Sequence, residues 1–383
     1  MNDFGTFNVR LTLLSPVHIG CGEDFEPTNF VITDDGRLLH FDFMKFLKNI
    51  NNPEVCRSLS KDFSEKDLFY IHKLIYKIYT QNYNYKKIGC TSIIPVSAEI
   101  KDRYKEQIIK SNTSDIFNQF HIARTSFCPN TKEPYIPGSS IKGALRTSWI
   151  SGLAEKRKIT TQPDKQNSSN HYAKKKENEL LNCSFQTDPF RLLKVSDFYA
   201  EGKPARKIVY KINKKKEPNS TRASSDIPII LETIQPKQQP KQPNSEFIGS
   251  ITISNPLDKR IQEPIKAKEL FESINKYFFR AFKRESETLQ RLNITLSTPI
   301  LYNSIVTEKR DSHHTLALLR IGQHCGAECM TLEGNRSIKI KQGPNQPAVY
   351  KDHSTTIWLA SEKHTPDAND ELHPFGWVLL EEI

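Results

Sequence analysis

The stretch Tyr135-Ile-Pro-Gly-Ser-Ser-Ile-Lys-Gly-Ala-Leu-Arg-Thr147 places a turn directly before the start of a helix. Pro137-Gly138 favours the turn, and Ser139 or Ser140 is suited to capping a helix that runs to about Lys156. The first N–H groups of a helix have no partner within it and lie at its positive dipole end, so they bind phosphate well. The stretch therefore predicts a helix whose first turn binds phosphate.

Two cations follow the turn at helical spacing. Lys142 and Arg146 are four residues apart and share one helix face, and Gly143 between them leaves room for another backbone. We interpret this arrangement as a seat for one or two phosphates. It is not a nucleotide P-loop, because Ala144-Leu145 stands where that motif needs Lys-Ser/Thr. An ordinary capped surface helix is the alternative interpretation.

A glycine-containing loop follows the first predicted strand. Hydrophobic and polar residues alternate from Phe7 to Leu14, which predicts a strand that Ser15-Pro16 ends. In the loop, Gly20 and Gly22 resemble the start of a dinucleotide fingerprint, but the third glycine is missing. His18 is a candidate general base or base-stacking ring, although a single histidine beside a turn is more often structural.

A second strand with a glycine-containing loop lies near the C-terminus. The segment Leu316-Ala-Leu-Leu-Arg-Ile-Gly-Gln-His-Cys-Gly-Ala327 places Arg320 and Gly322 where the strand meets the loop. Arg336, Lys339 and Lys341 follow, and the two lysines share one strand face. These residues suit a phosphate backbone, and an exposed strand with solvated lysines is the alternative.

The positive charge of the chain is local. The formal net charge is +11, of which residues 156–176 contribute +6 and residues 203–216 contribute +7, so the remainder sums to −2. Concentrated lysine and arginine favour contact with a polyanion, because neutralised phosphates release counterions. Solvated, partly disordered loops would give the same pattern.

The hydrophobic pattern mixes helices and strands. Helical spacing is evident over 65–79 and is clearest over 267–292, where one apolar stripe predicts a core-facing helix. Residues 159–178 lack such a pattern and predict a flexible insertion, and residues 236–243 form a low-complexity linker or hairpin tip. We therefore predict an α+β fold with strands over 191–200, 206–212, 227–234, 247–254, 316–321, 337–341, 355–360 and 376–381.

Length and composition favour a two-domain, reduced, cytoplasmic protein. A chain of 383 residues exceeds one ordinary domain, and we place the boundary between 1–255 and 256–383. Seven scattered cysteines argue against a disulfide framework. The sequence predicts neither a signal peptide nor a membrane span.

Signatures of metal and nucleophile chemistry are weak. Cys325-x3-Cys329 lies near His313, His314 and His324, but it lacks the second well-spaced pair of a zinc site. No nucleophile elbow, zinc-binding His-Glu-x-x-His helix or paired acids of a two-metal nuclease are recognisable. We predict no metal, no cofactor and no catalytic residue.

Three motifs together resemble the RAMP superfamily of CRISPR-associated proteins. They are Ser15-Pro-Val-His-Ile-Gly-Cys-Gly22, Ile136-Pro-Gly-Ser-Ser-Ile-Lys-Gly-Ala-Leu-Arg146 and the glycine-containing element near the C-terminus. More narrowly, four C-terminal segments resemble the fifth-subunit (Csm) family of type III-A effector complexes. These segments are Leu319-Arg-Ile-Gly-Gln-His-Cys-Gly-Ala-Glu328, Arg336-Ser-Ile-Lys-Ile-Lys341, Thr356-Ile-Trp-Leu-Ala360 and Phe375-Gly-Trp-Val-Leu-Leu-Glu381.

The resemblance implies two ferredoxin-like (RRM-like) domains with helical and disordered insertions. It implies a subunit at the head of the complex that caps the filament of backbone subunits and holds the 3′ region of the crRNA. Its expected partners are the crRNA, other Csm-type subunits, target RNA indirectly and host maturation nucleases, in antiviral defence. The predicted RNA-binding residues are His18, Gly20, Gly22, Arg124, Gly138, Ser139, Ser140, Lys142, Gly143, Arg146, Arg320, Gly322, Arg336, Lys339 and Lys341.

Three rival interpretations stay open at this point. A CRISPR-repeat endoribonuclease of the same fold would use His18 as its general base. A stand-alone tandem RNA-binding module would need exposed aromatic platforms, and no such Phe/Tyr pattern is recognisable. A pure assembly scaffold would not need its basic loops to retain RNA.

Overall fold

The structure is a computed structural model that mixes helices and sheets, which confirms the predicted α+β class. None of the helices that it describes is both long and apolar enough to cross a membrane. The described residues are 2–50, 53, 65–81, 89–110, 121–159, 169–181, 184–217, 228–237, 246–257, 259–261, 263–294, 302–303, 315–342, 346–367 and 370–383.

The first sheet joins the two ends of the chain. Its strand order is β13-β18-β1-β12-β9-β7, and β8 also pairs with β12. The predicted alternation in β1 is confirmed, because Phe7, Val9, Leu11 and Leu13 are all buried. The strands are β1 (Gly5–Leu13), β7 (Tyr135–Ile136), β8 (Leu193–Val195), β9 (Phe198–Ala200), β12 (Glu246–Ile253), β13 (Leu316–Arg320) and β18 (Trp377–Glu382).

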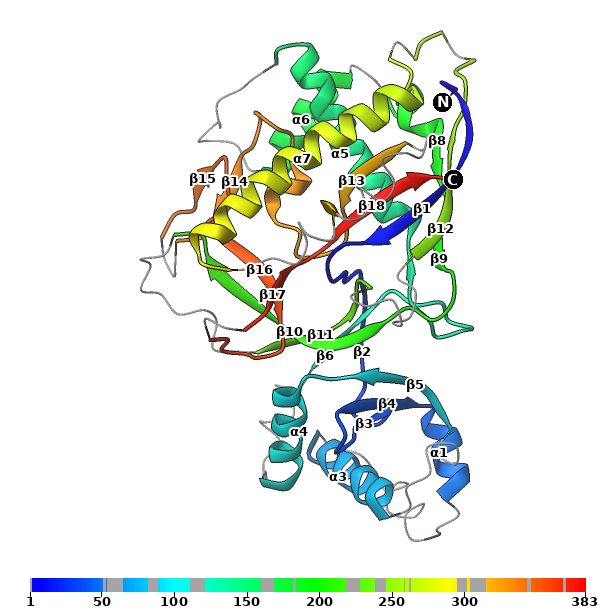
Figure 1. The fold of residues 1–383 in the computed structure, drawn as a ribbon, viewed down its shortest axis with the longest axis vertical. Helices are drawn as coiled ribbons and strands as arrows, with labels where there is room; N and C mark the ends of the chain where they lie inside the picture. The colour runs from blue at the N-terminus through cyan, green and yellow to red at the C-terminus, as the bar shows by residue number, and fades with distance from the viewer. Residues whose placement is uncertain are drawn as a thin grey trace.

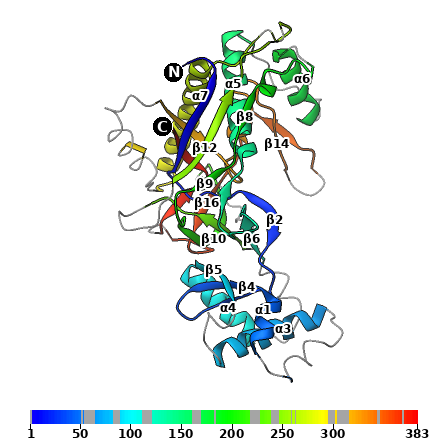
Figure 2. The same cartoon turned by 90° about the vertical axis from the view of Figure 1, so that its right-hand side faces the viewer.

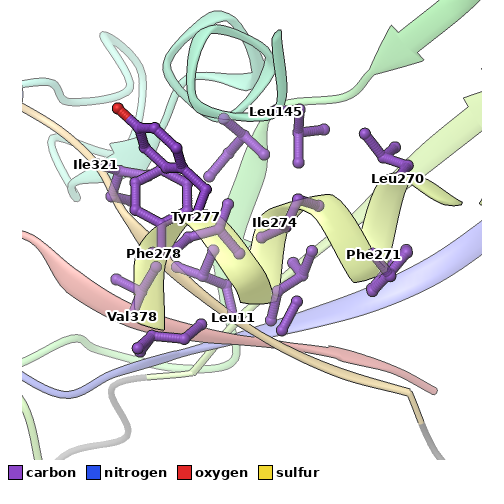
Figure 3. Close-up of a cluster of buried hydrophobic side chains, with 14 of the residues drawn as sticks. Leu11, Leu145, Leu270, Phe271, Ile274, Tyr277, Phe278, Ile321 and Val378 are labelled. Atoms are coloured by element: carbon purple, nitrogen blue, oxygen red, sulfur yellow. The ribbon is translucent and has the colours of Figure 1, made fainter. Parts of the chain in front are cut away.

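Two helices pack on this sheet. Helix α5 (Gly138–Lys156) and helix α7 (Ala267–Arg291) share one hydrophobic core with the buried face of β1 and β18. Figure 3 shows the predicted apolar stripe of α7 in this core, where Ile274 and Phe278 lie near Leu145, Leu11 and Val378. The stripe is a core-facing surface, as its spacing predicts.

The second sheet lies below the first in Figure 1. Its order is β17-β16-β10-β11-β6-β2, in which β6 and β11 are parallel and the other pairs are antiparallel. The strands are β2 (Gly20–Asp24), β6 (Ile122–Thr125), β10 (Arg206–Lys215), β11 (Ile229–Ile234), β16 (Thr356–Ser361) and β17 (Leu372–Pro374).

An inserted unit hangs below the second sheet, between β2 and β6 of the chain (Figures 1 and 2). Its three-stranded sheet packs with helix α4 and, through Ile94, Ile100 and Tyr104, shares a core with Ile208 and Tyr210 of β10. It comprises β3 (Phe30–Ile32), β4 (Arg37–Phe41), α1 (Phe43–Ile50), α3 (Glu65–Gln81), β5 (Cys90–Pro95) and α4 (Ala98–Lys110).

Several predictions about the middle of the chain are corrected. The insertion predicted to be flexible over 159–178 contains part of α6 (Ser169–Leu181). The strand predicted over 191–200 is divided into a 3-10 turn, β8 and β9, with Asp197 at the break. Of the linker predicted over 236–243, all but the first two residues lie outside the described part. The remaining elements are the 3-10 turns η2 (Pro189–Arg191) and η3 (Ala327–Met330) and the ribbon of β14 (Ile338–Ile340) and β15 (Val349–Lys351).

Strands from both sides of residue 255 meet in each of the larger sheets. In the first sheet β1 pairs with β12 and with β18, and in the second β10 pairs with β16. A division into 1–255 and 256–383 would therefore run through both sheets. Local pattern could not reveal this, because the pairing joins strands hundreds of residues apart.

Candidate nucleic-acid interface

An acidic side chain accepts a hydrogen bond from the first turn of α5. The Gly138 N–H donates a hydrogen bond of 2.8 Å to Oδ1 of Asp197. A Cβ at Gly138 would lie 2.4 Å from the carbonyl oxygens of Val195 and Ser196, so glycine lets α5 pack closely on β8 and β9. The predicted phosphate position thus holds a carboxylate, and Gly138 serves packing here.

The serines of the motif do not cap the helix. Pro137 is the N-cap residue, and α5 has no capping hydrogen bond from a side chain, which corrects the prediction for Ser139 or Ser140. Ser139 and Gly143 are exposed, and a Cβ at Gly143 would meet nothing within 4 Å. The surface over these two residues is therefore open to a partner.

The two cations of the motif share one face, as predicted, but that face turns toward the protein. Lys142 Nζ donates a hydrogen bond of 2.6 Å to the carbonyl oxygen of Leu193. Arg146 pairs with Glu177 at 2.5 Å and Asp188 at 2.9 Å. Burial lowers the pKa of Lys142. Both side chains thus fasten α5 to neighbouring elements.

Replacing both Lys142 and Arg146 by alanine is expected to lower stability by about 1–3 kcal/mol, because Glu177 and Asp188 lose their partner. The measurement is urea unfolding, combined with RNA binding at several salt concentrations. We expect an unchanged salt dependence. A slope reduced by about 1.4–1.8, the value for two lost phosphate contacts, would instead support the predicted clamp.

Three loops meet where the two larger sheets adjoin. The loop after β1 accepts two hydrogen bonds of 2.9 Å. The Gln323 N–H donates to the His18 carbonyl oxygen, and the Gly376 N–H donates to the Pro16 carbonyl oxygen. Gly322 has φ +85°, and a Cβ there would lie 2.5 Å from the His18 carbonyl oxygen. The structure therefore brings together the predicted glycine loops of both halves. The close contact between them explains why position 322 is a glycine.

His18 is part of this packing. Its side chain is 2% exposed, its Nδ1 donates to the Glu232 carbonyl oxygen at 2.7 Å, and its ring stacks on His324 at 5.8 Å. Burial lowers the pKa of both rings, that of His324 to about 3, so both are neutral near pH 7. A ring so enclosed has no path to an RNA 2′-hydroxyl in this conformation.

Gly20 and Gly22 lie at the rim of the same junction, in β2, which Figure 2 shows beside β6 at the waist of the molecule. A Cβ at Gly20 would meet the Gln323 amide at 2.5 Å, whereas Gly22, with φ +79°, faces open space. Arg124 in β6 is buried, with its guanidinium 3.6 Å above the Phe127 ring and 3.5 Å from Glu23. Only Gly22 of these three is exposed.

Lys211 was missed by sequence reasoning. It lies in β10, half-buried, with Nζ 4.4 Å from the centre of the Trp358 ring. No carboxylate among the described residues pairs with it, and burial lowers its pKa. A cation that is fixed by an aromatic ring and lacks an acidic partner is suited to bind an external anion.

Other polar groups surround Lys211. The Asn213 Oδ1 atom, on the same face of β10 and opposite Trp358 in β16, is buried without a hydrogen-bond partner. His324 lies 6.1 Å from Trp358 in a loop with positive φ. Period-two alternation within the basic segment 203–216 places Lys207, Lys211 and Asn213 on one strand face. This alternation is the sequence feature from which the site could have been predicted.

The C-terminal cations divide into two groups. Arg320 is buried, pairs with Glu285 and lies 4.9 Å from the Trp377 ring centre, and Arg336 is buried and pairs with Glu333 at 2.7 Å. Both are structural cations here. Lys339 and Lys341 are exposed on the β14–β15 ribbon, as their shared strand face predicts.

A partly buried ion pair joins the end of β10 to η3. Glu328 lies 2.5 Å from Lys216 and accepts hydrogen bonds from the backbone and side chain of Ser354. Burial alone would raise the pKa of Glu328, but Lys216 and Ser354 outweigh it and hold the pKa at about 2.

The low pKa of Glu328 predicts loss of stability in acid. Its folded-state value is below the usual 4.5, so its stabilisation is complete above about pH 4.5 and disappears as the pH falls toward 2. The effect is on the order of 3 kcal/mol. Urea unfolding of the protein and of Glu328→Gln at pH 7 and pH 3 tests it. An equally acid-sensitive variant would assign the effect to other groups.

Within the described residues, the Cys/His cluster of the sequence does not gather into a metal-ligating group. Cys325 and Cys329 are buried, and the Cys325 thiol donates to the Ile321 carbonyl oxygen at 3.0 Å. Burial raises the pKa of Cys325 to about 12, which disfavours the thiolate that binds metal. His313 and His314 lie outside the described residues, and within the described part no three metal-ligating side chains gather.

A family model described as the RAMP superfamily matches residues 10–297, about three quarters of the chain. The chain belongs to the RAMP superfamily. The matched residues include Gly20 and Gly22 of β2, the α5 motif and β10 with Lys211, whereas Gly322, His324 and Trp358 lie beyond the match.

Relatives of known name are similar to this RAMP chain. It is 27% identical over 231 residues to the "CRISPR system Cms protein Csm5" of Methanocaldococcus jannaschii, covering 59% of this chain and 50% of that protein. The chain thus matches about half the length of this curated relative.

Two solved structures share the fold. One is a chain of the "Csm-crRNA-target RNA ternary complex in type III-A CRISPR-Cas system", with a TM-score of 0.60 and 16% identity, covering 98% of this chain and 100% of that chain. The other is "T.onnurineus Csm5", with a TM-score of 0.53 and 15% identity, covering 96% and 99%. The likeness extends over nearly the whole chain.

Proposed function

We propose that this RAMP protein is a crRNA-binding subunit of the fifth Csm type in a type III-A effector complex. It would cap the head of the backbone filament in the cytoplasm, hold the 3′ region of the guide and support guide maturation in antiviral defence. The observation that carries the proposal is Lys211, a half-buried cation in β10 of the RAMP match that has no acidic partner among the described residues.

The guide would pass over the waist of the molecule. Lys211 would bind a phosphate, the open surface at Gly22 and Gly143 would let the backbone approach, and Lys339 and Lys341 would add charge from the ribbon. Such contacts position RNA without reading its bases, as a subunit that must accept any spacer requires. The same complex would reach target RNA indirectly and would admit host maturation nucleases.

We further propose that the two larger sheets are the two ferredoxin-like units of the superfamily. In support of the first unit, its elements β1, α5, β9, β12, α7 and β18 occur along the chain in a β-α-β-β-α-β order, with strand order β18-β1-β12-β9. We assign no catalytic role to His18, because its ring is 2% exposed, and we propose no intrinsic nuclease activity.

Assembly with and without this chain tests the proposed place. The other subunits of the complex are expressed with a CRISPR array, and the 3′ ends of the bound guides are sequenced. With the chain present we expect guides that end at defined positions. Without it we expect guides with heterogeneous or altered 3′ ends. Identical 3′ ends in both preparations would contradict a role at the 3′ region.

A further inference from the structure

A large groove lies between the inserted unit and the second sheet. Its volume is about 1550 Å³, and its walls come from β5, α4, β10, β16 and β17. Pockets for small molecules are typically about 300–1000 Å³. The size suits a segment of a macromolecule.

The charge of the groove does not suit RNA. Seven Asp or Glu residues line it, against five Lys or Arg residues. Three of these cations are already paired: Lys207 with Glu362, Lys363 with Asp370, and Arg206 with Glu232. Two of their partners, Glu362 and Asp370, are among the seven acids, so the lining has a formal charge of −2, which disfavours a phosphate backbone.

Two exposed acids stand on opposite walls. The Asp102 carboxylate on α4 is 66% exposed, 3.4 Å from the Lys101 ammonium, and the Glu371 carboxylate next to β17 is 85% exposed. The neighbour of Glu371 is His373, whose pKa burial lowers, so it does not neutralise that carboxylate near pH 7. Each wall therefore presents one exposed carboxylate to the groove.

An open strand edge runs along the groove. The inserted sheet has the order β3-β4-β5, which leaves β5 at its edge, and Val96 just beyond β5 makes one isolated bridge to Ile208. Thr91 and Ile93 of β5 are exposed and line the groove, and the exposed fraction of Ile93 is 39%. Unpaired edge strands bind extended peptides through their backbone groups.

We propose that this groove binds an extended, lysine- and arginine-rich segment of a neighbouring protein subunit. The segment would add to the edge of β5 as a fourth strand, with its cations facing Asp102 and Glu371. This inference rests on the proposed place in a multi-subunit complex, but Lys211 is not among the residues that line the groove.

Photo-cross-linking in the assembled complex tests the groove. The photoreactive residue p-benzoylphenylalanine replaces Ile93, the purified complex is irradiated, and cross-linked peptides are sequenced by mass spectrometry. We expect one segment of a neighbouring subunit in which Lys and Arg outnumber Asp and Glu. Adding Asp102→Lys with Glu371→Lys should reduce the cross-link about five-fold or more, since two attractive pairs become repulsive.

The matched control is Glu269→Lys with Glu272→Lys, two exposed acids of α7 outside the groove, which should leave the cross-link unchanged. A cross-link to RNA, to this chain itself or to an uncharged segment, or no cross-link, would overturn the inference. A charge reversal without effect would do so too. Guide RNA is quantified in each complex: its retention without the cross-link refutes the groove alone, whereas its absence refutes the proposed function.

Discussion

Replacing Lys211 by methionine is expected to weaken the binding of every guide RNA by about ten-fold to a hundred-fold, the effect of losing one charge-assisted hydrogen bond of about 1.5–3 kcal/mol. Methionine keeps an unbranched apolar stem against Trp358 but removes the ammonium. Stability should therefore be unchanged or slightly higher, because a half-buried charge is removed. RNA binding measured at several salt concentrations should give a slope smaller by about 0.7–0.9.

Lys207 provides the matched control for Lys211. It lies on the same face of β10, four residues earlier, but its ammonium is paired with Glu362. Lys207→Met should change RNA affinity by less than about two-fold, in line with the small contribution of exposed ion pairs. Equal effects of the two substitutions would mean that general positive charge, and not the site at Trp358, holds the RNA.

Gly138→Ala and Gly143→Ala are expected to change stability in opposite directions. A Cβ at position 138 would lie 2.4 Å from two carbonyl oxygens, so α5 must move, at a cost of about 1–3 kcal/mol. A Cβ at position 143 meets nothing within 4 Å, so alanine should stabilise the helix by about 0.5–1 kcal/mol. Thermal or urea unfolding of the two variants measures the difference.

The same pair separates packing from RNA contact. Both glycines were predicted to bind RNA, yet only Gly143 faces solvent. Weaker RNA binding by the more stable Gly143→Ala variant would show that a backbone approaches α5 at this point. Unaltered stability of Gly138→Ala would contradict the close packing of α5 on β8 and β9.

Elements whose burial follows a local period were predictable from the sequence. The alternation in β1 and the stripe of α7 are examples, because a strand or helix that packs on one core shows that core in its own residue spacing. In the inserted unit, the helical spacing over 65–79 predicted α3, but the strands β3, β4 and β5 were missed. In β3 all three residues, Phe30, Val31 and Ile32, are buried, so there is no alternation to detect.

The site was predictable in its loops but not in its charges. Glycine and cation patterns identified the loops that meet at the waist. The acidic partners of Arg146 and Arg320 are Glu177, Asp188 and Glu285, which lie 31 to 42 residues away. Spacing along the chain identifies a cation, but it does not show whether that cation forms an ion pair with a carboxylate far away in the sequence. Lys211 is the converse case, since only the fold shows that it has no acidic partner among the described residues.

The most direct test of RNA binding is to isolate the complex that this chain forms. The chain is co-expressed with its genomic neighbours and a CRISPR array, purified through a tag, and the bound RNA is sequenced. The account predicts a multi-subunit particle that carries repeat-derived RNAs with one shared 5′ tag, and much less RNA on the Lys211→Met chain when it is assayed alone. A single protein without RNA, or with random cellular RNA, would contradict it.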